Sequence, residues 1–295
     1  MGQEQNAFHK TFSRQQVSGL KESAKSLAEN HNHQEGLKTI LGLLDLTSLN
    51  TTDNITSIGS LCTKVNRFPE HFPGLPNVAA ICVYPNFVET VKDLLTVSDV
   101  KIASVAGGFP SSQTYFQIKR SEIGIALDKG ADEIDIVFPL GLFIENDIDA
   151  VLNELREMKE MMGEKHLKVI LETGAYSSYN DIYRASMLAM HAGADFIKTS
   201  TGKQQPAATL EAVGIMCTAI NDYYHASGKK VGIKPAGGIS TTQDALPYYS
   251  MVFEVLGPDW LKPALFRIGA SRLANDLLAH IQYHVTGSRE EIGYF

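Results

Sequence analysis

The chain has 295 residues, 44% of them apolar, and a formal net charge of −7. This length and apolar content suffice for one domain with a large buried core. The negative charge argues against nucleic acid as the main partner. Three cysteines without a C-x-x-C pair, and apolar stretches too short to span a membrane, lead us to expect a soluble, cytoplasmic protein with reduced thiols that does not bind membranes.

The N-terminal segment, residues 1–36, is polar and is expected to lie outside the core fold. Apolar residues recur at helical spacing from Val17 to Leu27, which predicts a helix over Gln15–Glu29. We therefore expect an N-terminal helical extension, a catalytic domain over residues 37–286, and a C-terminal tail over residues 287–295.

The rest of the chain alternates between short apolar runs, typical of buried strands, and segments with a helical period. The predicted strands are Lys38–Leu46, Val78–Tyr84, Lys101–Ala106, Glu133–Phe138, Leu167–Glu172, Ala194–Ser200, Lys229–Gly238 and Ala264–Gly269. The predicted helices are Asp53–Asn66, Phe87–Leu95, Thr114–Lys129, Asp147–Met162, Tyr179–Ala192, Ala207–Ala226, Thr242–Leu256 and Ser271–His284.

This alternation predicts an α/β protein with a parallel sheet covered by helices. Eight strand–helix units without a break in composition favour a single (β/α)8 TIM barrel with an extra N-terminal helix. A doubly wound open sheet is the alternative. It is less favoured because the first strand–helix turn lacks a G-x-G-x-x-G fingerprint.

Two lysines, Lys198 and Lys234, each lie inside a predicted buried strand. Burial of an ammonium group favours its neutral form, and a neutral amine is the nucleophile of imine chemistry. The two strands are joined by one predicted helix, so we expect them to be parallel neighbours or near-neighbours. At a separation of about 6 Å and an effective dielectric of about 20, the two charges would repel by about 2.8 kcal/mol, or about two pKa units. Spacing does not decide which lysine has the lower pKa.

Two acids complete this group of charges. Asp45, near the end of the first predicted strand, is either a cap for the next turn or an inward-facing carboxylate. Asp135 lies between two isoleucines and, by the period of a strand, on the same face as Glu133. Charges at the carboxyl ends of barrel strands are typical of an active site. The alternative is that each lysine only forms a buried ion pair with an acid, which often adds little stability.

Three glycine-containing loops follow the last three predicted strands. They are Ser200–Lys203, the pair Gly237–Gly238, and Gly269–Arg272. Glycines let backbone N–H groups approach an anion, and the loops after the seventh and eighth strands are the usual phosphate position of a TIM barrel. With Lys203 and Arg272 as cations, these loops predict a phosphate site. Ordinary helix caps are the alternative interpretation.

Six segments carry a resemblance to a known family: LLDLTSLN, AICVYP, DEIDIVFP, FIKTSTGK, GIKPAGGI and IGAS. In this order they are similar to the motifs of the deoxyribose-phosphate aldolase family, class I aldolases that form a Schiff base, over residues from about 38 to 285. The resemblance implies that Lys198 is the Schiff-base lysine. It implies that Lys234 is the cation that lowers the pKa of Lys198, and that Asp135 is the proton-relay acid.

The resemblance also implies the rest of the site. Asp45, Cys82 and Thr201 would line the substrate pocket, and Tyr294, the residue before the last, would reach it. The residues expected to hold phosphate are Gly202, Lys203, Gly237, Gly238, Ser271 and Arg272. Family members often carry Arg after the GGI motif and a second Ser after GAS, where this chain has Ser240 and Arg272. A cation has thus moved from one phosphate loop to the next.

The implied reaction is the reversible cleavage of 2-deoxy-D-ribose 5-phosphate to D-glyceraldehyde 3-phosphate and acetaldehyde, as in deoxyribonucleotide catabolism. It needs no cofactor and no metal, and the expected assembly is a homo-oligomer, with a dimer favoured. A metal-dependent enzyme is one alternative, although His280 and His284, its candidate ligands, are more simply a surface pair on the last helix. A sugar-phosphate-binding barrel without activity is the other, and it would have little reason to keep both lysines.

Overall fold

The computed structural model describes residues 8–288 and 290–295. The strands are β1 (Leu44–Thr47), β2 (Ala80–Val83), β3 (Lys101–Val105), β4 (Glu133–Val137), β5 (His166–Ile170), β6 (Phe196–Lys198), β7 (Gly232–Lys234) and β8 (Ile268–Ala270). They form one sheet in the order β7-β6-β5-β4-β3-β2-β1-β8, with every pairing parallel. Parallel bridges from Ile233 to Phe266 and from Ala236 to Gly269 join its two ends. The sheet is therefore closed into a barrel.

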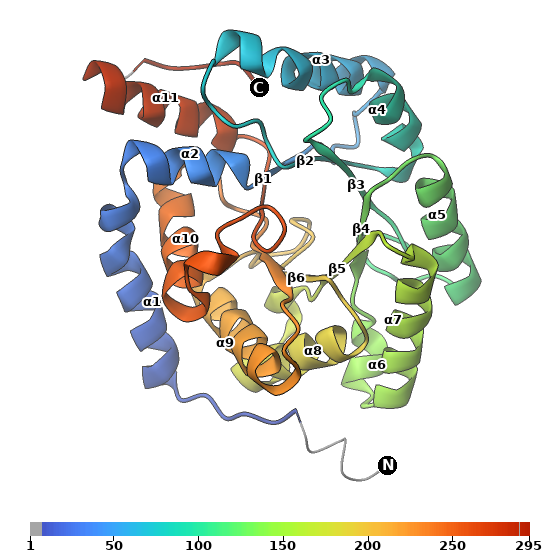
Figure 1. The fold of residues 1–295 in the computed structure, drawn as a ribbon. Coiled ribbons are helices and arrows are strands. Elements are labelled where there is room, and N and C mark those ends of the chain that lie inside the picture. Colours follow the sequence, from blue (N-terminus) through green and yellow to red (C-terminus); the bar gives the residue numbers. More distant parts are fainter. Residues whose placement is uncertain (1–7, 289) are drawn as a thin grey trace.

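Helices surround this barrel on the outside (Figure 1). They are α1 (Arg14–Ala28), α2 (Gln34–Gly42), α3 (Ile55–His71), α4 (Val88–Leu94), α5 (Phe116–Asp128), α6 (Leu140–Ile144), α7 (Ile148–Met162), α8 (Tyr179–His191), α9 (Leu210–Ser227), α10 (Thr242–Leu256) and α11 (Leu273–Thr286). Four short 3-10 turns are η1 (Glu29–His31), η2 (Pro85–Phe87), η3 (Thr173–Ala175) and η4 (Pro258–Trp260). The predicted (β/α)8 TIM barrel is confirmed, with each strand followed by at least one helix.

The core lies between the strands and the helices, and α7 shows how the sequence builds it. Asp147 caps this helix by accepting from the backbone N–H of Ala150. Four apolar side chains then recur at spacings of three and four residues and are buried against the sheet: Val151, Leu155, Met158 and Met162. The strands beneath are buried on both faces, which explains their nearly continuous apolar sequences.

One predicted element is wrong in its first half. The segment Lys38–Leu46 was expected to be a strand, but α2 occupies residues up to Gly42 and β1 begins only at Leu44. The buried residues Leu37, Ile40 and Leu41 have the i, i+3, i+4 spacing of a helix that packs against α11. This short helix therefore belongs to the outer layer and leads directly into the first strand.

The N-terminal extension packs on the outer helices. Ser13 and Gln16 form a capping box at the start of α1, as the predicted helix requires. From there α1 lies along α9 and α10, with Val17 and Ala24 buried (Figure 1). The expected boundary after residue 36 falls inside α2, because that helix begins at Gln34. Within the part of the chain described here, no helix has the length and hydrophobicity needed to cross a membrane.

Candidate active site

The two lysines of the predicted site face each other across adjacent strands. β6 and β7 are paired with Lys198 opposite Lys234, which confirms the expected neighbouring strands. Both side chains are buried, and both ammonium groups donate to the same oxygen, Oδ2 of Asp135 on β4, at 2.8 Å. The three charged groups inferred from the sequence therefore meet at one point inside the barrel.

These groups belong to a larger interior charge cluster, whose members are Asp45, Glu133, Asp135, Lys168, Lys198, Lys234 and Arg267. Asp45 faces inward and lies 2.5 Å from Lys234 and 2.6 Å from Arg267. Of its two sequence interpretations, the inward-facing carboxylate is therefore the correct one. Buried ion pairs, the alternative explanation of the lysines, are also present. A pure ion-pair role does not explain why cations outnumber carboxylates in the cluster.

Two cations of this cluster were not singled out from the sequence. Lys168 on β5 lies 2.6 Å from Glu133 and 3.0 Å from Asp135. Arg267, just before β8, contacts Glu133 at 2.8 Å as well as Asp45. Each is a lone cation in an apolar segment, HLKVIL and ALFRIG, which is the same signal that pointed to Lys198 and Lys234. Both pair with the buried carboxylates, and neither lines the cavity above Lys198.

The cluster holds four cations and three carboxylates. One excess positive charge in a buried space is costly, and loss of one proton removes it. Burial lowers the pKa of Lys198, and Lys234 lowers it further against the opposing attraction of Asp135. Lys234 is the opposite case: burial alone would lower its pKa, but the carboxylates of Asp135 and Asp45 outweigh burial and raise it. The contacts thus distinguish two lysines that spacing left equivalent.

Charge repulsion between the two lysines was expected to be the main cause of the lowered pKa of Lys198, but the structure gives a different order. Burial, rather than the neighbouring Lys234, is the larger cause of the lowered pKa of Lys198. Asp135 remains ionised, because three surrounding lysines outweigh its burial and hold its pKa well below the usual value. Cys82 on β2 lies within reach of this field and is fully buried. Burial raises the pKa of its thiol, so Cys82 stays neutral.

A cavity of about 220 Å³ opens above Lys198 at the carboxyl ends of the strands. The predicted phosphate residues and Thr201 all line it, together with Lys198 itself. The full lining is Thr47, Leu49, Asn50, Lys198, Thr201, Gly202, Lys203, Ala236, Gly237, Gly238, Ile239, Ser240, Gly269, Ala270, Ser271 and Arg272. Asp45, Cys82, Asp135 and Lys234 are not among these residues. Of these four, Asp135 contacts the cavity-lining Lys198 directly, and Lys234 and Asp45 follow behind it in the same cluster.

The loops around the cavity have the conformations that glycine allows. Gly202 and Gly237 have φ angles of +75° and +86°. A Cβ atom on Gly237 would collide with Ala207 and would crowd the Cα of Gly202, so the two loops can approach this closely only because residue 237 has no side chain. Lys203 extends across the mouth and donates to the backbone carbonyl of Leu49 at 2.5 Å. A cationic side chain thus lies ready at the mouth.

Glu172, which was not singled out from the sequence, holds this loop in place. Its buried carboxylate accepts from the backbone N–H of Thr201 at 3.1 Å and from the Thr201 hydroxyl at 2.6 Å. Its backbone has a φ of +55°, an unusual conformation for a residue with a side chain. Strain of this kind is common where a residue fixes a functional loop. The segment LET alone carries no signal for it.

The changed positions of the phosphate loops lie on the same cavity. Ser240 and Arg272 both line it, so the cation that moved along the sequence still faces this space. Ser240 is held by the carboxylate of Asp244, which accepts from its backbone N–H at 3.0 Å. The chain has Ser240 where relatives often carry Arg and Arg272 where they often carry Ser, and this difference leaves a cation at the cavity.

The expected contact of Tyr294 with the pocket does not occur in this structure. The Tyr294 hydroxyl donates to the backbone carbonyl of Lys64 at 2.6 Å, and its ring packs on Phe72 of the segment after α3. Its neighbour Phe295 comes closer to the site and lines an adjoining cavity together with Ser271. The aromatic pair Tyr294 and Phe295 anchors the C-terminus to α3, next to which Figure 1 places that end of the chain.

The two histidines of the last helix differ in burial and in their partners. His280 is buried, contrary to the expected surface pair, and lies 3.0 Å from Thr242 and 3.0 Å from Gln243. His284 is exposed and lies 3.5 Å from Asn32. Over residues 8–288 and 290–295, no three His, Cys, Asp or Glu side chains are grouped to hold a metal ion.

Comparison with known proteins places these features in context. The model of the DeoC/LacD family aldolases matches residues 39–248. The deoxyribose-phosphate aldolase of Homo sapiens is 43% identical over 256 residues, or 83% of this chain and 80% of that protein. The Bos taurus enzyme of the same name has the same identity and coverage. A tetrameric deoxyribose phosphate aldolase from Aeropyrum pernix has a similar fold, with a TM-score of 0.68 and 20% identity over 90% of this chain and 99% of that one.

Proposed function

Because the chain belongs to the DeoC/LacD family of aldolases, we infer that it is a lyase that cleaves 2-deoxy-D-ribose 5-phosphate reversibly. The products are D-glyceraldehyde 3-phosphate and acetaldehyde, and the reaction is of the class I type, in which a lysine forms a Schiff base. One observation supports this function above the others. A lysine whose pKa is lowered by burial lies at the floor of a cavity whose rim carries glycine loops and cations.

Lys198 is the proposed nucleophile. It lines the cavity, its pKa is lowered, and a neutral amine attacks an aldehyde carbon. Attack on C1 of the open-chain sugar phosphate gives a carbinolamine, and loss of water gives an iminium ion. Lys234 is the proposed partner: it stays charged beside Lys198 and makes protonation of that amine less favourable. The ionised Asp135 connects the two.

The carbon–carbon bond breaks in the next step. Asp135, through a water molecule, takes the proton of the C3 hydroxyl while the C2–C3 electron pair moves to the iminium and forms an enamine. D-Glyceraldehyde 3-phosphate leaves. The enamine is protonated at C2, and hydrolysis of the resulting iminium releases acetaldehyde and restores Lys198. Asp45 supports this relay by holding Lys234 at 2.5 Å.

The phosphate group would bind at the rim of the cavity. Thr201, Gly202 and Lys203 come from the loop after β6, Gly237 and Gly238 from the loop after β7, and Ser271 and Arg272 from the start of α11. Backbone N–H groups in glycine loops and near a helix N-terminus suit an anion. The span from Lys198 to this rim would set which aldehyde carbon reaches the amine.

Borohydride trapping with acetaldehyde tests this proposal. Borohydride reduces an iminium to a stable secondary amine, so peptide mass mapping should locate an ethyl group on Lys198 alone. The variant Lys198→Arg should give no adduct while keeping the unfolding temperature of the wild type. An adduct at another lysine, or an equal adduct in Lys198→Arg, would contradict the proposed role of Lys198.

We further propose that the chain acts in deoxyribonucleotide catabolism in the cytoplasm, as a homodimer. The three cysteines are free and buried, which suits a reducing compartment. For the dimer, α5 offers an exposed apolar face formed by Tyr115, Ile118 and Ile125, and the extension over residues 1–36 could add contacts. Sedimentation equilibrium tests the assembly: twice the chain mass is expected, and a monomer at micromolar concentration would contradict it.

A further inference from the structure

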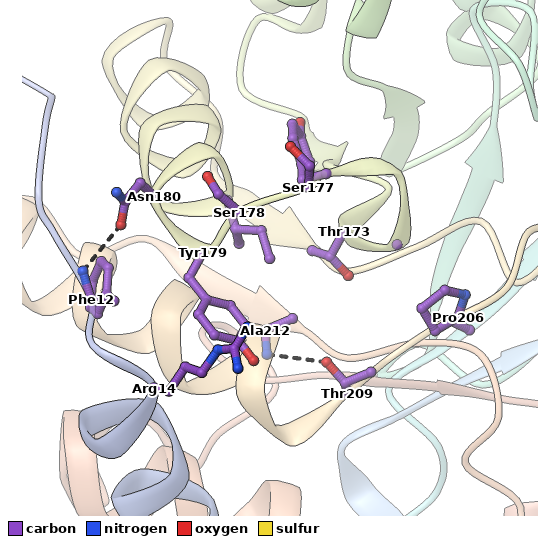
Figure 2. A pocket seen from close by; sticks show the side chains of 14 residues that line it. Phe12, Arg14, Thr173, Ser177, Ser178, Tyr179, Asn180, Pro206, Thr209 and Ala212 are labelled. Atoms are coloured by element: carbon purple, nitrogen blue, oxygen red, sulfur yellow. Dashed lines mark hydrogen bonds between the residues drawn. The ribbon is translucent and has the colours of Figure 1, made fainter.

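A second cavity, of about 470 Å³, lies on the outer side of the loops that follow β5 and β6. It has a volume typical of small-ligand pockets, and it shares no lining residue with the cavity above Lys198. Its walls come from the N-terminal extension, the start of α8 and the start of α9, and Figure 2 shows side chains from these three segments around one space. Its lining includes Arg14, Thr173, Tyr176, Ser178 and Thr209.

Two long helices begin at this cavity. Ser178 caps α8 and Thr209 caps α9, and both capping residues line the space. Helix N-termini carry partial positive charge and backbone N–H groups without helical partners, which favours an anion. Arg14 is the only charged residue among those that line the cavity. It forms no ion pair with another residue of the described chain.

Polar groups without partners point to a ligand independently of the helix ends. The Thr173 side chain is buried, with 5% of its surface exposed, and its hydroxyl has no hydrogen-bond partner within the described residues. The hydroxyl of Tyr176 is also buried and without a partner there. In Figure 2 the Thr173 oxygen points toward the space bounded by Pro206 and Thr209. Buried polar atoms without hydrogen bonds are rare in native proteins and call for a missing partner.

The nearby acids do not oppose an anion strongly. Glu172 directs its carboxylate away from the cavity, to Thr201 on the other side of the loop. Glu211, in the first turn of α9, is paired with Lys21 at 2.7 Å. Asp181, in the first turn of α8, accepts from the Ser178 hydroxyl at 2.7 Å and does not line the cavity. The lining is therefore one cation surrounded by hydroxyl, amide and backbone donors.

From these observations we propose that this cavity is a second binding site, separate from the catalytic one, for a small phosphorylated compound with hydroxyl groups. Arg14 and the N-termini of α8 and α9 bind the phosphate, and Thr173 and Tyr176 bond to the hydroxyl part. Pro206, Ala207 and Thr209 line this cavity, while Thr201, Gly202 and Lys203 of the same loop line the catalytic one. An occupant therefore contacts the outer side of the loop that carries the proposed phosphate residues.

Equilibrium binding of glycerol 3-phosphate to the full chain tests the proposal. Calorimetric titration should find two molecules per chain in the wild type. Arg14→Gln should bind one, and Lys203→Gln, which alters the catalytic rim, should also bind one. Arg120→Gln is the matched control, an exposed arginine on α5 outside both cavities, and should still bind two. Thr173→Val keeps the side-chain shape and should weaken only the second site, by about fivefold for one lost hydrogen bond.

Two molecules per chain in Arg14→Gln would overturn the proposal. So would a single molecule in the wild type that Lys203→Gln removes and Arg14→Gln leaves unchanged. Because catalysis does not enter this measurement, its result is independent of the proposed aldolase mechanism. Conversely, two molecules in Lys203→Gln but one in Arg14→Gln would support the second site and count against the phosphate role of Lys203. Thermal unfolding of each variant verifies that it is folded.

Discussion

Asp135 Oδ2 accepts from two ammonium groups at equal distances of 2.8 Å, yet the two lysines differ in what else they touch. Lys234 contacts a second carboxylate, Asp45, whereas Lys198 contacts Asp135 alone. Since a carboxylate favours the charged form of a lysine, this one extra contact separates their pKa values. The sequence could not predict this difference, because Asp45 on β1 reaches Lys234 on β7 only once the barrel closes.

Replacing Lys234 tests this explanation at the residue scale. In Lys234→Leu, Lys198 loses a positive neighbour and Asp135 loses one of its partners, so both changes raise the pKa of Lys198. The pH profile of imine formation should move upward by about one to two units. At pH 7 the rate of trapping should fall about 10-fold to 100-fold. Borohydride trapping with acetaldehyde, followed across pH 6 to 10 in roughly unit steps, measures the profile.

The control for this variant is another buried lysine. Lys119 is paired with Glu154 on the outside of the barrel, so Lys119→Met should leave the profile unchanged. Lys234→Leu also leaves two buried carboxylates with fewer partners and should lower the free energy of unfolding by about 3 to 5 kcal/mol. The amount of trapped adduct is therefore divided by the amount of folded protein in each sample before the variant and the wild type are compared. If the pH profile of Lys234→Leu is identical to that of the wild type, Lys234 does not lower the pKa of Lys198.

A second residue-scale prediction concerns Glu172. Glu172→Gln keeps the shape of the side chain but weakens two charge-assisted hydrogen bonds to Thr201. Thr201 then holds the phosphate loop less firmly, so KM for deoxyribose 5-phosphate should rise about 10-fold with a smaller change in kcat. Steady-state kinetics with deoxyribose, which lacks the phosphate, is the comparison. An equal rise in KM for both sugars would argue against action through the phosphate loop.

At the scale of single elements, the sequence predicted a helix or strand correctly where its segment showed only one period and clear signals at its ends. The helix Thr242–Leu256 was predicted with both of its ends, because Thr241 caps it and Gly257 follows it. The error at Lys38–Leu46 has the opposite cause. In KTILGLLDL the last turn of a helix runs into a buried strand, and a continuous apolar run does not show where the period changes. The short helix α6, Leu140–Ile144, was missed for the same reason.

The capping box of α1 gives a prediction for that element. In Ser13→Ala the Gln16 backbone N–H loses its acceptor, so the free energy of unfolding should fall by about 1 kcal/mol. Ser18→Ala, in the exposed middle of the same helix, should cost nothing, because alanine is the better helix former. Urea unfolding followed by circular dichroism compares the two. Equal stability of both variants would mean that α1 unfolds separately from the barrel.

At the scale of the whole molecule, barrel closure assembles the interior charge cluster from segments 222 residues apart in sequence, as the contact between Asp45 and Arg267 shows. The sequence predicted the barrel and the meeting of Asp45, Asp135, Lys198 and Lys234, because strand ends converge at one face. It did not predict how Lys168 and Arg267 share the carboxylates. That depends on the register between strands, which a period of two leaves undetermined.

This cluster predicts how stability depends on acid. The pKa values of Glu133 and Asp135 are held well below their ordinary values, despite burial, by the lysines around them. Groups with lowered pKa values stabilise the fold above their unfolded pKa, near 4, and this stabilisation is lost as the pH falls further. We expect a loss on the order of a few kcal/mol between about pH 5 and pH 3. Urea unfolding across this range measures it, and Glu133→Gln should show a shallower slope.

The most direct measurement of the central claim is the titration of the lysine amines themselves. With ¹³C at the ε-carbon of every lysine, NMR should show one signal that titrates below the ordinary pKa of about 10.4. That signal should be missing from Lys198→Arg and should move to higher pH in Lys234→Leu. If the Lys198 signal instead titrates with the exposed lysines, near 10.4, the amine is charged at neutral pH and the account of the site is wrong.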